Sequence, residues 1–217
     1  MSTTRQSWPV PVVLAALSAI PVTAGTLRLI QLAGGPAIIP ANERMAGFPL
    51  PLVVHIVGAT IYALVGILQL HPRFRRRHLD WHRKAGRVVA GAGLLVAVSA
   101  LWMTVAFEAQ RGSGALLYVL RLVFGTAMAA CIALGVTTVR RGDIVGHQAW
   151  MTRAYAIGLA AGTQAFTEGI GEAIFGTGVI AADLAKGAGW VINLAVAEHA
   201  LRQPTTRRST AQAAVAS

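Results

Sequence analysis

Three ionisable side chains lie inside long apolar stretches of this sequence: His55, Arg121 and Glu168. A carboxylic acid removed from water can stay protonated and protonate an alkene, epoxide or carbonyl, while a neutral imidazole can act as the base. A guanidinium beside them would bind an anionic group or keep the carboxylate ionised. The three residues therefore predict acid–base chemistry, of a cyclase or isomerase type, on an amphipathic lipid-like or prenyl-like substrate.

These residues can act together only if the elements that carry them bring them to one depth. Crossing a hydrocarbon core of about 30 Å takes roughly 20 apolar residues of helix. Six stretches meet this requirement: 9–34, 48–70, 85–107, 115–139, 149–172 and 179–199. The sequence thus predicts an all-α bundle of six transmembrane helices over residues 1–203, with a disordered basic tail at 204–217. Asp183 and Lys186 leave an alternative for the last span, in which 177–187 forms a short outer helix.

The charges are distributed unevenly among the connections. Lys and Arg crowd residues 73–87, recur at 140–141 and follow the last predicted span, whereas the alternate connections hold little beyond Arg44 and Arg111. By the positive-inside rule both termini are cytoplasmic. The net charge of +11 is therefore topological, which excludes a nucleic-acid footprint and favours contact with anionic lipid head groups. A content of 55% hydrophobic and 12% charged residues also excludes an ordinary soluble domain.

Depth along the predicted helices places several polar residues in one outer layer. A rise of about 1.5 Å per residue puts His55 and Arg121 roughly 8 to 10 Å below the outer surface. Arg28, Gln164 and Glu168 reach a similar height, because the first and fifth spans run outward. Ionisable groups inside a membrane usually face the bundle interior or a wet cavity, although Arg28 also suits snorkelling at a helix end. We expect His55, Arg121 and Glu168 to be catalytic and Gln164 and Arg28 to bind the ligand.

A second polar layer lies at the inner side. Residues 82–87 read HRKAGR, residues 147–153 read HQAWMTR and residues 190–198 read WVINLAVAE. Buried charges are normally paired, so Glu198 is expected to neutralise Arg153 or, second, Arg87, with Asn193 capping the network. This layer either locks three helices together or binds a ligand. Its candidate binding residues are His82, Arg87, His147, Arg153, Asn193 and Glu198.

The same three segments, after a histidine early in the second span, resemble a bacterial family of predicted membrane proteins, the domain of unknown function 2306. That family carries His-Arg-x-x-Gly-Arg, His-x-x-Trp-Met-x-Arg and Trp-x-x-Asn-Leu-x-x-Ala-Glu in this order, and the resemblance covers about residues 48–201. Two features depart from it: the basic run at 73–77 is unusually dense, and Gln164 stands where an arginine is expected. The resemblance implies an architecture and a residue list, and it implies no reaction.

Two other classes of function stay open beside the enzyme. A bis-histidine haem needs two imidazoles from different helices at one depth, and the sequence offers His55 alone in the outer layer and His82 with His147 in the inner layer. His78 and His82 have the i, i+4 spacing that suits a divalent metal if 77–84 is helical, although Asp80 points to another face. The remaining class is non-enzymatic binding or scaffolding, and the oligomeric state stays open.

Overall fold

The computed structural model describes residues 9–40, 49–110 and 112–203, and every regular element within these ranges is an α-helix. The predicted all-α class is confirmed, whereas the predicted tail at 204–217 lies outside the described residues. In chain order the helices are α1 (Pro9–Leu32), α2 (Leu50–Leu70), α3 (Pro72–Arg77), α4 (Leu79–Ala106), α5 (Ala115–Arg140), α6 (Ile144–Gly158), α7 (Ala160–Phe175) and α8 (Val179–Arg202).

Five helices of the described part are long and apolar enough to cross a membrane: α1, α2, α4, α5 and α8. The segment predicted as the fifth span is instead divided at Leu159 into α6, of 15 residues, and α7, of 16 residues. Each of these is shorter than the roughly 20 residues that a straight span needs. A broken helix was not expected from the sequence.

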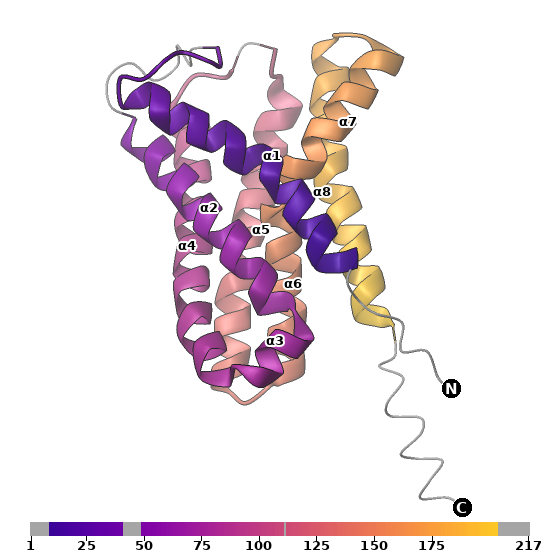
Figure 1. Cartoon of the computed structure of the whole chain (residues 1–217). Coiled ribbons are helices and arrows are strands. Elements are labelled where there is room, and N and C mark those ends of the chain that lie inside the picture. The colour runs from indigo at the N-terminus through magenta and orange to yellow at the C-terminus, as the bar shows by residue number, and fades with distance from the viewer. Residues whose placement is uncertain (1–8, 41–48, 111, 204–217) are drawn as a thin grey trace, which may run out of the picture.

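The elements are arranged so that alternate connections lie at opposite ends of the bundle (Figure 1). The short helix α3 and the α5–α6 connection lie at the lower end of the view, which we call the α3 end. At the opposite end, called here the far end, lie the end of α1 with the start of α2, the end of α4 with the start of α5, and the connection from α7 to α8. Basic residues gather at the α3 end: Arg73, Arg76, Arg77, Arg83, Arg140, Arg141 and Arg202.

Close packing in the core depends on two tyrosine rings and the glycines beneath them. The rings of Tyr62 and Tyr155 lie 5.6 Å apart, and the Tyr155 hydroxyl donates to the Ala63 carbonyl at 2.8 Å. A side chain at Gly93 would collide with the Tyr62 ring, and one at Gly66 would collide with the Tyr155 ring. Small residues let helices approach in this way, so α2, α4 and α6 are held together at the centre of the bundle.

Two predicted helix boundaries are corrected. The helix α4 begins at Leu79 and not near residue 85, so HRKAGR forms its first turns. The helix α8 runs unbroken from Val179, so the alternative of a separate short helix at 177–187 is wrong. Asp183 is compatible with a continuous α8 because it is only 1% exposed and is bonded inside the bundle.

Candidate functional site

The helices surround a cavity of about 410 Å³, called here the central cavity. Its walls are contributed by α1, α2, α4, α5, α6, α7 and α8. Apolar side chains, including Ile56, Phe124 and Met128, form most of the surface. An apolar pocket with a few polar groups is the composition of a small-molecule site. The polar and charged residues that line it are His55, Thr60, Thr104, Arg121 and Gln164.

His55 is held by α4 in a defined tautomer. Its Nδ1 lies 3.2 Å from the Val96 carbonyl oxygen and 3.1 Å from the Ser99 Oγ. The Ser99 hydroxyl itself donates to the Leu95 carbonyl at 2.6 Å, so it is free to accept from the imidazole. Because a carbonyl can only accept, the pairing with Val96 puts the proton of a neutral ring on Nδ1 and leaves a lone pair on Nε2. His55 thus brings a hydrogen-bond acceptor to the cavity wall.

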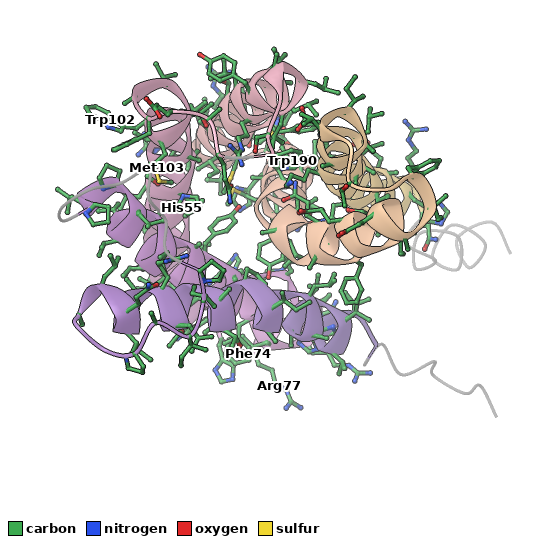
Figure 2. All side chains as sticks on the ribbon, turned by 90° about the horizontal axis from the view of Figure 1, so that it is seen from above. His55, Phe74, Arg77, Trp102, Met103 and Trp190 are labelled. Atoms are coloured by element: carbon green, nitrogen blue, oxygen red, sulfur yellow. The ribbon has the colours of Figure 1, made fainter. Side chains whose placement is uncertain are left out.

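Arg121 and Gln164 line the same cavity from other helices. Arg121 lies in the second turn of α5, and Gln164 lies in α7, where its side-chain amide donates to the Lys186 carbonyl of α8 at 3.0 Å. The Trp190 ring stacks on Phe124 with centroids 4.8 Å apart and adds a flat wall. Viewed down the bundle, His55 and Trp190 lie on opposite sides of the centre (Figure 2). The structure therefore brings together three of the five predicted outer-layer residues.

The other two predicted outer-layer residues, Glu168 and Arg28, are not among the described residues that line the cavity. Glu168 pairs through Oε2 with the Lys186 ammonium at 3.0 Å. Arg28 lies near the end of α1 and donates to the Pro40 carbonyl at 2.7 Å and to the Gln31 amide oxygen. Depth alone predicted that all five residues would share one site. Glu168 and Arg28 lie outside the cavity because their side chains point in other directions around their helices.

Asp183 caps the start of α5, a role that was not expected from the sequence. Its carboxylate accepts from the backbone N–H groups of Gly114 and Leu117, each at 3.1 Å, and so caps the start of α5 from α8. A carboxylate at a helix N-terminus satisfies free N–H groups and is stabilised by the helix dipole. This cap ties the start of α5 to α8. The sequence did contain a signal for this contact. Asp183 is a charged residue inside a predicted span, and α5 begins directly after Gly114 without a capping side chain of its own.

One ion pair joins two of the three inner motifs. The Arg153 guanidinium makes two bonds to the Glu198 carboxylate, at 2.5 and 3.2 Å, which confirms the predicted pair. It also lies over the Trp150 ring, 4.9 Å from its centroid. Asn193 does not cap this pair, because its amide donates to the Ala156 carbonyl at 3.1 Å and accepts from the Thr163 hydroxyl at 2.7 Å. Asn193 thus ties α8 to the break between α6 and α7.

The remaining inner residues divide between partnered and unpartnered groups. His147 bonds through Nδ1 to the Gly135 carbonyl at 2.8 Å, which joins α6 to α5. His82 Nδ1 is buried without a hydrogen-bond partner among the described residues, whereas Arg87 is exposed. Of the two histidines at metal-binding spacing, the His78 ring packs on Phe74 with centroids 4.8 Å apart. In the described ranges no group of three His, Cys, Asp or Glu side chains is placed to hold a metal ion.

Comparison with known proteins adds one result to this geometry. No curated protein and no solved structure matches the chain. The family model described as a predicted membrane protein, DUF2306, matches residues 52–201. That stretch includes His55, Arg121 and Gln164 of the central cavity as well as the Arg153–Glu198 pair. Since the match covers more than half of the 217 residues, the chain belongs to the DUF2306 family of predicted membrane proteins.

Proposed function

We propose that the protein binds an amphipathic small molecule in the central cavity, with an anionic or strongly polar head group near Arg121 and His55. The observation that carries this proposal is the composition of the cavity, in which one guanidinium, one imidazole, one amide and two threonine hydroxyls interrupt apolar walls. Its volume of about 410 Å³ lies in the range of roughly 300 to 1,000 Å³ typical of small-molecule pockets.

The polar groups suit a ligand that carries both an acceptor and a hydroxyl. A guanidinium offers planar, paired donors that match a carboxylate or phosphate. The lone pair on His55 Nε2 can accept from a ligand hydroxyl, because Nδ1 is engaged by the Val96 carbonyl. The apolar tail would lie along Ile56, Met128 and Phe124. Apolar burial of this kind contributes roughly 25 cal/mol for each Å² removed from water.

Binding is a better reading than proton transfer by Glu168. That carboxylate is paired with Lys186 and does not line the cavity, so a substrate in the cavity would not meet it. A haem reading is weakened in the same way, because His55 is the one lining histidine of the six in the chain. An enzymatic role would then rest on His55 as a base, with Arg121 binding the developing anion.

For topology we propose that α6 and α7 together form a sixth, broken span and that the α3 end faces the cytoplasm of a bacterial inner membrane. Non-helical backbone at membrane depth needs polar partners, and Asn193 supplies one to the Ala156 carbonyl beside the break. The excess of arginine at the α3 end supports the orientation. A periplasm-active reporter fused after Arg202 should be silent, whereas activity would mean that one segment fails to cross.

The binding proposal is tested by identifying what co-purifies with the protein. The full chain is purified in mild detergent, extracted with organic solvent and analysed by mass spectrometry. An amphipathic compound should be present with the natural chain and lost from Ala100→Leu, because Ala100 lines the cavity and a larger side chain fills it. The matched control is Ala130→Leu, since Ala130 is exposed on α5 and is not among the lining residues.

Two outcomes would overturn the proposal. Equal loss of the compound from Ala100→Leu and Ala130→Leu would mean that it does not bind in the central cavity. A Soret band in the visible spectrum of the same preparation, abolished by His55→Gln, would make the cavity a haem site. Arg121→Gln should release the compound without removing the apolar walls, so retention there would exclude an anionic head group.

A further inference from the structure

We propose a second, independent site: a groove at the α3 end that binds the head group of an anionic phospholipid. The groove has a volume of about 800 Å³ and lies apart from the central cavity, with which it shares none of its described lining residues. We call it the basic groove. Its described lining residues are Pro11, Ile67, Leu68, His71, Arg73, Phe74, Arg76, Arg77 and His78.

The charge of the basic groove is of one sign. Arg73, Arg76 and Arg77 are all exposed, and their i, i+3, i+4 spacing on α3 places them on one face. No Asp or Glu is among the described residues that line the groove. Arg75 belongs to the other side of α3: it is partly buried, and this burial lowers the pKa of its guanidinium. Three of the four arginines are therefore directed to the groove, a pattern that favours a phosphate ligand.

A neutral donor joins the three cations. His71 Nδ1 accepts from the Phe74 backbone N–H at 3.2 Å, so the proton of the neutral ring is on Nε2. Since His71 lines the groove, it adds one N–H donor to the guanidinium groups. Phe74 is fixed between the His78 ring, at 4.8 Å, and the Trp81 ring, at 4.9 Å and 88°. These ring contacts hold α3 against the start of α4 and so fix the position of its arginines.

The position of the apolar wall identifies the ligand as a lipid. Ile67 and Leu68 lie in the last turn of the candidate span α2, and the arginines follow directly after its end. The groove thus runs from the level of acyl chains to the level of head groups. Seen down the bundle, Phe74 and Arg77 emerge at the edge of the molecule, away from His55 and Trp190 (Figure 2). A diacyl phospholipid could enter there from the bilayer and place its acyl chains against the apolar wall. A free phosphate ion has no apolar part that could contact this wall.

The test measures lipid selectivity of the full chain by native mass spectrometry in detergent, with phosphatidylglycerol and phosphatidylcholine as probes. Phosphatidylglycerol should bind more tightly by a factor on the order of 100, from three surface arginines. Arg73→Gln/Arg76→Gln/Arg77→Gln should abolish this preference. The matched control Arg140→Gln/Arg141→Gln/Arg202→Gln removes three exposed arginines from the same end but outside the groove, and should keep it.

A second variant keeps the test decisive if the triple change prevents insertion. Leu68→Gln alters one exposed apolar side chain and should weaken phosphatidylglycerol binding about three- to tenfold while leaving all arginines in place. Two results would overturn the proposal. One is an equal loss of preference in both triple variants, which would mean general surface charge. The other is displacement of the lipid by millimolar inorganic phosphate with no effect of Leu68→Gln, which would mean a free phosphate site.

Discussion

The central cavity and the contacts around Arg153 use similar residue types in opposite ways. Around Arg153 the charges are consumed internally, because the guanidinium is bonded to Glu198 and lies over Trp150. At the central cavity His55 and Arg121 also border an open space, although His55 is bonded to α4 as well. Two of the three family motifs, at residues 147–153 and 190–198, supply the contacts around Arg153. A recurrent sequence motif in a membrane helix can therefore mark how helices are joined, while the place for a ligand lies elsewhere.

The largest change in stability is expected at Asp183, outside both regions. Asp183→Ala leaves the N–H groups of Gly114 and Leu117 without their acceptor in a buried place. Losing a charged cap that is 1% exposed should cost about 3 kcal/mol, or roughly 6 to 12 °C in Tm. Thermal unfolding in detergent measures this. Asp183→Asn keeps an acceptor and should lose about a third as much; equal losses would show that the bonds to α5 are unimportant.

The next largest effect separates binding from stability. Arg121→Gln should weaken the cavity ligand about 10- to 100-fold, the value of a charge-assisted hydrogen bond. Competition with the extracted compound gives the affinity. A fall in Tm as large as that of Asp183→Ala, with affinity unchanged, would make Arg121 a structural residue and remove the contrast between the two regions.

A smaller loss is expected for Glu198→Ala, which leaves the Arg153 guanidinium unpaired. The two side chains are 28% and 34% exposed, so the cost should be about 1 to 2 kcal/mol, below the value for a fully buried pair. Asp80→Ala is the control, because Asp80 and Arg83 are 3.8 Å apart and mostly exposed. That change should leave Tm unaltered. Equal changes in Tm for the two variants would mean that the Arg153–Glu198 pair does not stabilise the packing of α6 on α8.

The smallest effect is predicted for Glu168→Gln. The pair with Lys186 is partly exposed, so its loss should cost under about 1 kcal/mol. Because Glu168 does not line the central cavity, the affinity for the extracted compound should stay the same. Selective loss of binding or of any catalytic turnover in this variant would support the hypothesis that Glu168 is the acid of an enzyme.

Depth along the chain was enough to predict much of the fold and part of the site. It located the five apolar helices of the described part, and it selected His55, Arg121 and Gln164, which line one cavity. It failed for Glu168 because the rise of a helix fixes the height of a side chain but not its direction around the axis. The Glu168 side chain points toward α8, where its carboxylate pairs with Lys186.

The sequence by itself determined the apolar helices and the excess of basic residues in particular connections, because hydrophobic length and the charge of a connection are local properties. For Glu198 it left Arg153 and Arg87 as possible partners, and the structure shows the pair with Arg153. Tertiary structure decided the break at Leu159, the cap that Asp183 gives to α5 and the boundary of the central cavity. Each of these depends on which faces of distant helices meet. A backbone carbonyl or N–H group takes a side chain as partner only after packing has brought that side chain within about 3 Å.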